Sequence, residues 1–530
     1  MDELPAGRRV RLHARIAQAL ERAAATRAVA VGDLAAHFTA AGTLVDAARG
    51  VHYARAAGDE AAAKLAYDIA GQQYERALRA QEGLSHVREA ERLDLELERG
   101  RVLKLAGDER ADELLRAFAT AAEARGDGER MAEALLALGL DWADLVEEDA
   151  EMVALLRQAL ALLPSGDSAI RARLEGFLAQ EAFSSVPDSE RRAMVGRALA
   201  IARRVGDAKA LASVLTAHSW IVAGPESLPG RLALADELVA VGRERGLPYA
   251  ETDGHHMRFL ALVELGDVEA ADDTLTAART AARTGRAHGT VAFLDAARAL
   301  LAGRLQAAEA EARRMHEALR AAGSIPPSAA ESTFVRMLSL IRLVQGRLSE
   351  HEAARRAMAE GVTKLPATFF VVRAHAARER DDRDGARKAF ERALDEGLVD
   401  LPHGPTWTIS LTWAADICAW LEDRPRAARL YDLLAPFGDV MTYQYGPVAR
   451  AVGRLAQTLD RHDEAEQLLR DAVALCERMD ARAFLAMARQ DLGELLLPSP
   501  EGRRLLEQAR AAANELGMPG LTKRAVAAYE

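Results

Sequence analysis

One stretch, residues 452–473, limits what this chain can fold into more than any other. Two apolar segments flank a short polar turn at residues 460–463. Gly453 precedes Ala465 by twelve residues, and Ala472 follows Ala465 by seven. In the second segment the apolar residues recur at helical spacing and form one stripe: Ala465, Leu468, Leu469, Ala472, Val473 and Cys476. The stretch therefore predicts two helices that pack closely across their small residues.

The same spacing recurs along the chain as an alanine, a large residue four positions later and a second alanine three positions beyond. Copies stand at Ala70/Tyr74/Ala77, Ala271/Leu275/Ala278, Ala386/Phe390/Ala393 and Ala465/Leu469/Ala472. The small residues let a neighbouring helix approach, and the large one fills the groove between them. This is the spacing of a tetratricopeptide repeat. The sequence therefore predicts an all-α fold, an α-solenoid superhelix of tetratricopeptide-like helix pairs.

The first 50 residues lack this spacing and form a helical segment of another kind. We expect residues 51–530 to form the repeat superhelix. Possible subdivisions lie near residues 165, 227, 326 and 403, where proline and glycine cluster. Because proline disfavours helical backbone at the residue before it, each cluster is expected to end a helix.

The net charge and the cysteines indicate which environment and which partners the chain can have. The net charge of −11 disfavours binding of nucleic acid through this chain alone, since such binding depends on a basic face. Cys418 and Cys476 stand far apart and do not suggest a disulfide framework. No apolar run suits a signal peptide or a membrane span. We predict a cytoplasmic protein with no membrane partner.

No motif for catalysis is found. The chain has no Gly-x4-Gly-Lys-Ser/Thr loop, which would bind phosphates. His255 and His256 are adjacent, so on a helix their side chains point about 100° apart and would not share a metal ion. We expect one of the two to be partly buried and the other to lie on the surface. The sequence predicts no catalytic, cofactor-binding or metal-binding residue, and no enzyme.

Aromatic residues are concentrated between Trp407 and Tyr445, in a chain that is otherwise poor in them. Two interpretations stay open: a thicker part of the hydrophobic core, or an aromatic binding patch on the concave surface of the solenoid. Tyr443 and Tyr445 stand beside Gly446-Pro447 in a predicted loop, and we expect these two to be the more exposed. The candidate ligand- or partner-binding residues are Trp407, Trp413, Trp420, Tyr443 and Tyr445.

Several segments at both ends of the chain carry a family resemblance. They are residues 8–21, 34–38, 53–59, 65–78, 430–437, 453–459 and 515–521. They resemble the region that follows the nucleotide-binding module in large bacterial signal-transduction ATPases. These include ATP-binding LuxR-type transcriptional regulators and adenylate-cyclase-linked relatives. The nucleotide-binding and DNA-binding domains of that family have no counterpart in this chain, so none of their functional residues carries over.

The resemblance implies a role for each part of the chain. Residues 1–50 resemble the winged-helix-like segment after the nucleotide-binding domain, and residues 51–530 the repeat arm. It implies a non-catalytic binding and regulatory module, the ligand- or partner-sensing arm of a transcriptional or signalling regulator. A protein or small-molecule effector would bind the concave face, and no cofactor is expected. The alternatives are a stand-alone protein–protein adaptor and a nucleic-acid-binding regulator.

Overall fold

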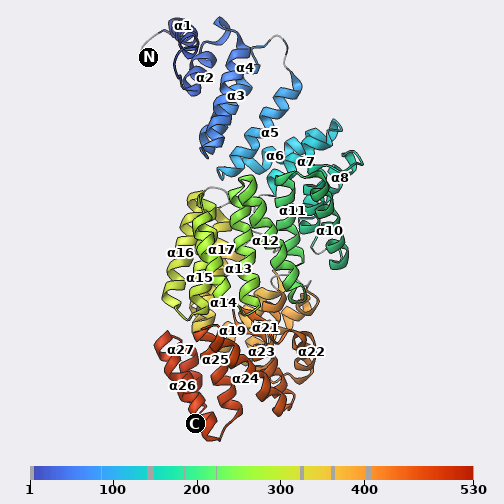
Figure 1. Ribbon diagram of the computed structural model, residues 1–530, viewed down its shortest axis with the longest axis vertical. Helices are drawn as coiled ribbons and strands as arrows, with labels where there is room; N and C mark the ends of the chain where they lie inside the picture. The colour runs from blue at the N-terminus through green and yellow to red at the C-terminus, as the bar shows by residue number, and fades with distance from the viewer. Residues whose placement is uncertain are drawn as a thin grey trace. The chain divides into compact units, whose positions relative to one another are not determined.

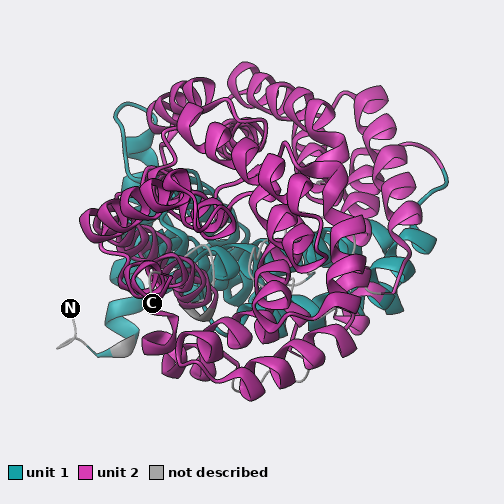
Figure 2. Cartoon of the chain, turned by 90° about the horizontal axis from the view of Figure 1, so that it is seen from below, with its two compact units in different colours: residues 1–142, 154–165, 322–327 teal, residues 143–153, 166–321, 328–530 magenta. Residues whose placement is uncertain are grey.

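The computed structural model describes residues 5–84, 86, 88–139, 149–183, 185–222, 224–322, 327–359, 365–401 and 407–528. Within these ranges the chain forms helices and one short hairpin (Figure 1). It divides into two compact units, which Figure 2 shows in teal and magenta. Unit 1 holds residues 1–142, 154–165 and 322–327, and unit 2 holds residues 143–153, 166–321 and 328–530. The predicted all-α fold class is confirmed.

The first helices of the chain belong to unit 1. They are α1 (Ala6–Ala24), α2 (Val31–Ala40), η1 (Gly42–Leu44, a 3-10 helix), α3 (Ala47–Ala63), α4 (Tyr67–Gln81), α5 (Glu89–Leu105), α6 (Ala111–Ala124) and α7 (Gly128–Leu138). Helix α8 (Ala150–Leu162) crosses the division between the units. The predicted division of the chain at residue 50 stays a prediction.

The other elements belong to unit 2, apart from the last residue of α16 and the first residue of α17. Its helices are α9 (Ala169–Glu181), α10 (Asp188–Val205), α11 (Ala208–Ile221), α12 (Leu228–Arg245), α13 (Pro248–Glu264), α14 (Val268–Ala281), α15 (Gly285–Leu301), α16 (Leu305–Ala322), α17 (Pro327–Gln345), α18 (Glu352–Ala359), α19 (Ala367–Glu379), α20 (Arg383–Asp395), α21 (Trp407–Leu421), α22 (Arg424–Leu434), α23 (Val448–Thr458), α24 (His462–Arg478), α25 (Arg482–Leu495), α26 (Pro500–Leu516) and α27 (Pro519–Ala527). The shorter elements are η2 (Pro225–Ser227), η3 (Leu348–His351), η4 (Leu398–Asp400), η5 (Ala435–Phe437), β1 (Met441–Thr442) and β2 (Gly446–Pro447).

The predicted helix pairs are present, and their small residues lie in the contacts. In all four copies of the alanine spacing, both alanines are fully buried. A Cβ on Gly58 would lie 2.7 Å from the ring of Tyr74. A Cβ on Gly453 would lie 2.9 Å from Cγ of Leu469. Glycine on the first helix thus makes room for the large residue of the second, and the tetratricopeptide-like pairing is confirmed.

The two helices of a pair differ in burial. In α23 the nine residues from Val448 to Ala456 are all buried, whereas α24 is buried along a single stripe. Helix α21 is likewise buried almost throughout. The first helix of these later pairs is therefore enclosed on all sides, while the second covers it and faces solvent. We call α13, α15, α17, α19, α21, α23, α25 and α27 the inner helices of unit 2.

Repeats that are far apart in the sequence meet along a seam within unit 2. Three turns that follow α13, α15 and α17 each contain a glycine at positive φ, between +71° and +78°. Each of these glycines packs against the last repeats, and α15 also contacts α25 (Figure 1). The contacts are Gly266 with Leu475, Gly303 with Ala483 and Leu516, and Gly346 with Gly520. Unit 2 therefore closes a turn of repeats upon itself.

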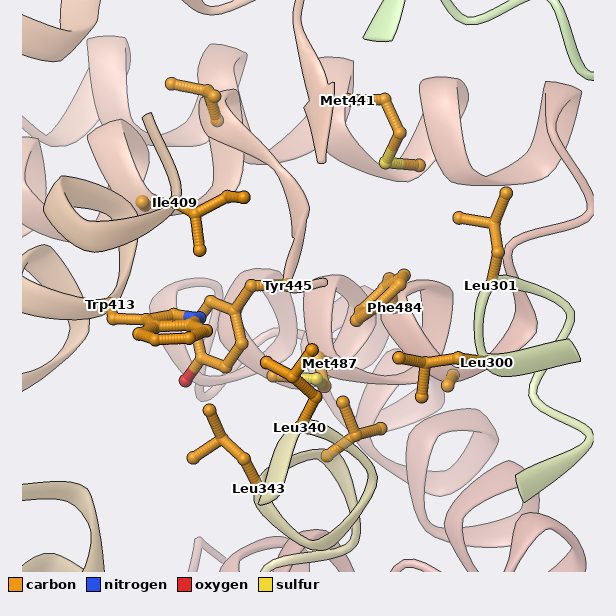
Figure 3. Close-up of a cluster of buried hydrophobic side chains, with 14 of the residues drawn as sticks. Leu300, Leu301, Leu340, Leu343, Ile409, Trp413, Met441, Tyr445, Phe484 and Met487 are labelled. Atoms are coloured by element: carbon orange, nitrogen blue, oxygen red, sulfur yellow. The ribbon is translucent and has the colours of Figure 1, made fainter. Parts of the chain in front are cut away.

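One continuous apolar core fills the interior of unit 2. It joins side chains of α13 to α17 with side chains of the later inner helices and of the hairpin β1–β2. Figure 3 shows part of it, with Leu300, Leu340 and Leu343 meeting Tyr445, Trp413 and Phe484. Cys418 and Cys476 are buried, and neither forms a disulfide. Among the described residues, no helix has the length and apolarity needed to cross a membrane.

Candidate functional site

The hairpin carries part of the aromatic segment into the interior of unit 2. Its strands pair antiparallel, with Thr442 opposite Gly446. The Thr442 hydroxyl donates to the Gly446 carbonyl at 3.0 Å and accepts from the N–H of Tyr445 at 3.2 Å. Gly446 has a φ of +86°, and a Cβ there would lie 2.9 Å from Cβ of Phe484. Only glycine allows the hairpin to approach α25 this closely.

Tyr445 is buried, with 3% of its surface exposed. Its hydroxyl donates to Asp416 on α21. Its ring meets Trp413 edge to face at a centroid distance of 6.3 Å and His375 at 5.8 Å. The expectation that Tyr445 is an exposed loop residue is therefore wrong. The turn points into the interior of unit 2 and not into solvent. There Tyr445 packs against the Trp413 ring and donates to the buried carboxylate of Asp416.

Tyr443 belongs to a row of rings that links the hairpin to the earlier inner helices. Its ring lies 6.0 Å from that of Phe293 on α15. The row continues from Phe293 to His256 at 5.2 Å and from His256 to Trp220 at 6.3 Å, always edge to face. Burial raises the pKa of Tyr443 to about 12, so its hydroxyl stays protonated. Tyr443 itself is partly exposed.

The three tryptophans lie in different surroundings. Trp413 packs beside Tyr445, and Trp407 packs in the core against Phe437 at 5.6 Å. Trp420 is partly exposed at the end of α21, with the guanidinium of Arg383 5.1 Å from its ring centroid. The five predicted aromatic residues thus do not share one surface. Their role in binding a ligand or partner stays a prediction.

A group of charged residues connects the inner helices beside Tyr445, and sequence reasoning missed it. Arg450 on α23 donates to Asp416 on α21 at 3.1 Å, and its Nε lies 2.7 Å from Asp491 on α25. Arg454 also pairs with Asp416. From α27, Arg524 reaches Asp491 at 2.6 Å. These ion pairs join four successive inner helices. We call Asp416, Arg450, Arg454, Asp491, Glu494 and Arg524 the buried charge cluster.

One signal in the sequence could have pointed to this cluster. Asp416 is the sole charged residue of the helix Trp407–Leu421, which is otherwise apolar or carries hydroxyl groups. A carboxylate on such a helix must be paired if it is to be buried. Arg450 and Arg454 stand four apart and therefore share one face of α23. Which carboxylate faces which arginine depends on the stacking of repeats and is not set by spacing.

The electrostatics keep both aspartates ionised. Burial alone would raise the pKa of Asp416, but Arg450 and Arg454 hold it well below its usual range. Arg450 and Arg524 lower the pKa of Asp491 in the same way. Burial lowers the pKa of His375 to about 3, so this imidazole is neutral, and its Nε2–H donates to the carbonyl of Trp413 at 3.0 Å. The two aspartates are thus ionised and paired, and the His375 imidazole is neutral and hydrogen-bonded. Their contacts fix the positions of the inner helices relative to one another.

Two surface hollows lie elsewhere on unit 2. One of about 370 Å³ lies at the seam and is lined by Arg279, Arg298, Arg304 and Arg482, among others. Another of about 290 Å³ is lined by residues of α24, α25 and α26. Neither hollow is lined by residues of the hairpin or of the buried charge cluster. The buried charge cluster and the hairpin therefore lie away from both hollows.

The described residues contain no group of three or more His, Cys, Asp or Glu side chains placed to hold a metal ion. His255 and His256 lie on α13, and both are buried. The expectation of one surface histidine is wrong, because α13 is an inner helix with neighbours on both sides. Burial lowers the pKa of His256 to about 4.

Comparisons with known proteins add little to this picture. No family model and no curated protein matches the chain. Among solved structures, the chain is similar to one from the Cut9–Hcn1 hetero-tetramer of APC/C, with 13% identity and a TM-score of 0.40, covering 90% of this chain and 94% of the other. It is also similar to a monomeric mutant of IFIT1 with m7Gppp-AAAA, with 14% identity and a TM-score of 0.33, covering 88% and 90%. The fold assignment rests on the helix pairs themselves.

Proposed function

We propose that the chain is a non-catalytic binding and regulatory module, the ligand- or partner-sensing arm of a transcriptional or signalling regulator. The observation that carries the proposal is the hairpin β1–β2, which occupies the inner side of the turn of repeats in unit 2. Solenoids hold ligands on their inner side. In this chain the inner side is occupied by the hairpin, which is not part of the repeats and takes the position that a ligand would have.

In this proposal the hairpin is the element that moves between two states, as a sensor requires. Among the contacts of its inward position are those of Tyr445 with Asp416, Gly446 with Phe484, and Tyr443 with Phe293. A protein or small-molecule effector that contacted the inner helices in place of the hairpin would favour a state with the hairpin displaced. Ligands shift such equilibria by their difference in affinity for the two states. Opening of the seam at Gly303 and Gly346 would accompany the change and transmit it along the repeats.

A photo-crosslinking experiment tests where the partner binds. A photoreactive phenylalanine analogue replaces Tyr443, which is partly exposed on the hairpin, or Tyr249, which is exposed at the start of α13 and serves as the control. The full chain carrying either residue is expressed in its host and irradiated, and the products are identified by mass spectrometry. We expect a defined product from position 443 and none from position 249.

The identified effector is then added to the wild-type chain, and hydrogen exchange is followed at residues 441–447. We expect faster exchange, because the effector displaces the hairpin. Unchanged exchange together with crosslinks from position 249 alone would favour the stand-alone adaptor and contradict the sensor. Hydrolysis of ATP by the purified chain would contradict a non-catalytic role.

A further inference from the structure

The buried charge cluster is electrically balanced. Its three arginines are Arg450, Arg454 and Arg524, and three carboxylates pair with them. Asp416 pairs with Arg450 and Arg454. Asp491 pairs with all three arginines, with Arg454 at 3.7 Å, and Glu494 pairs with Arg524. All three carboxylates of the cluster are therefore already paired, and a further positive charge nearby has none left to pair with.

Arg378 is such a charge. It lies three residues after His375 on α19, and positions three apart share one face of a helix. His375 marks this face as the inner one, because it contacts Tyr445 and the Trp413 carbonyl. Arg378 is partly buried, and within the described part of the chain it forms no hydrogen bond or ion pair. Burial lowers its pKa to about 10, and the charge of Arg454 lowers it too, whereas Asp416 opposes them.

A cation that is partly desolvated and has no partner is costly, and buried charges are normally paired. Arginine cannot relieve this cost by losing its proton at neutral pH. Its planar fork suits an oxyanion, which it binds with two parallel hydrogen bonds. The partial exposure of Arg378, and of Arg524 on α27 at 25%, leaves one edge of the cluster accessible from solvent.

We propose that the inner face of α19 is an oxyanion-binding site, in which Arg378 binds a carboxylate or phosphate group of the effector. The inference rests on the proposed function in that it names the chemistry of the effector on the same inner face. The shared chemistry is an oxyanion, and the choice between carboxylate and phosphate is left to the arms of the test.

The test is a titration of the full chain with inorganic phosphate and, separately, with succinate, at ionic strength held constant with sodium chloride. Urea unfolding followed by tryptophan fluorescence gives the midpoint at each concentration, and calorimetry gives direct binding. A ligand that binds only the folded chain stabilises it progressively above its Kd. We expect at least one anion to raise the midpoint of the wild type and to bind with a stoichiometry of one.

Two variants show whether Arg378 is the site. Arg378→Met should abolish the rise, and without the anion its midpoint should equal or exceed that of the wild type, since the deleted charge was unpaired. Arg373→Met removes an exposed arginine from the same helix and should keep the full rise. Should Arg378→Met fail to fold, Arg378→Lys, which keeps the charge but loses the fork, should bind the anion more weakly than the wild type.

The site is overturned if neither anion stabilises the wild type, or if Arg378→Met, or in its place Arg378→Lys, is stabilised as strongly as the wild type. The test separates this site from the sensing role. Anion binding that leaves exchange of residues 441–447 unchanged, with no effector that changes it, contradicts the sensor but keeps the site. Hairpin displacement by an effector that is independent of Arg378 contradicts the site but keeps the sensor.

Discussion

The pairs α3/α4 and α23/α24 are built alike and buried differently. In both, a glycine on the first helix faces a large residue sixteen positions later, Gly58 with Tyr74 and Gly453 with Leu469. Yet α3 buries a single stripe, whereas α23 buries nine consecutive residues, including Arg450 and Arg454. The spacing within a repeat decides how its two helices pack. What surrounds the inner helix is decided by repeats elsewhere in the chain.

A tyrosine–aspartate hydrogen bond shows the same difference. The Tyr74 hydroxyl on α4 donates to Asp59 at 2.7 Å, and Asp59 is exposed. The Tyr445 hydroxyl donates to Asp416, which is fully buried. The same two groups therefore interact once in contact with water and once in a protein interior. The effect of removing each aspartate measures what burial adds.

The largest effect is expected for Asp416→Ala. It leaves the Tyr445 hydroxyl without its partner and Arg454 with only Asp491, 3.7 Å away, and removal of one member of a buried ion pair costs about 3–5 kcal/mol. Asp59→Ala removes one hydrogen bond to an exposed carboxylate and should cost about 1 kcal/mol. Urea unfolding with hydrogen exchange of the affected helices measures both. Equal losses would mean that the Asp416 region is as hydrated as the surface.

The seam should be nearly as sensitive. A Cβ on Gly346 would lie 2.6 Å from Cα of Gly520, and Gly346 has a φ of +71°. Gly346→Ala should therefore cost about 3 kcal/mol, from a strained φ and an overpacked contact. Gly206→Ala is the matched control, with a φ of +73° and nothing within 4 Å, and should cost about 1 kcal/mol. Identical thermal shifts would show that the seam contributes no stability.

Substitution of the glycine at the helix contact should destabilise both pairs by the same, smaller amount, because this contact is alike in the two pairs. Gly58→Ala and Gly453→Ala each force a Cβ against the large residue of the partner helix, at 2.7 and 2.9 Å. Both should cost about 1–3 kcal/mol, because each is an overpacked helix contact. Local unfolding measured by hydrogen exchange within each pair provides the comparison. A loss confined to Gly453→Ala would show that pair packing, too, depends on the surroundings.

His375 should give the later repeats a pH dependence of stability that grows as the pH falls below 6.5. His375 is neutral in the folded chain, because burial lowers its pKa to about 3, whereas in the unfolded chain it protonates below its usual value of 6.5. The unfolded state then binds the extra proton, so stability is full above pH 6.5 and falls as the pH decreases toward 3. The loss is about 1.4 kcal/mol per pH unit. His375→Gln should remove this part of the slope in urea titrations between pH 4 and 6.5, and an unchanged slope would contradict it.

The sequence predicted what depends on neighbours in the chain. The alanine spacing and Gly453 gave the helix pairs, because these residues contact each other within one repeat. The inward hairpin could not be predicted in this way. Tyr443 meets Phe293, 150 residues earlier, and Gly446 meets Phe484. A loop with tyrosine, glycine and proline has the same local pattern whether it points to solvent or to a core.

The charge cluster was missed for a related reason. Asp416 and Asp491 are paired by arginines that lie between 33 and 41 residues away along the chain. A charged residue on a helix normally indicates a solvated face. The cluster reverses this rule because the turn of repeats closes on its own interior. Local patterns carry no information on that closure.

Hydrogen exchange at the hairpin tests the central claim, that the inner side of unit 2 is filled by residues 441–447. In the free full-length chain we predict that the amides of Tyr445 and Val448 exchange slowly, on the timescale of those in α23, since they donate to Thr442 Oγ1 and to the Val440 carbonyl in a buried setting. The variant Asp416→Ala should accelerate them. Exchange of these amides in the wild type as fast as in an exposed loop would contradict the account.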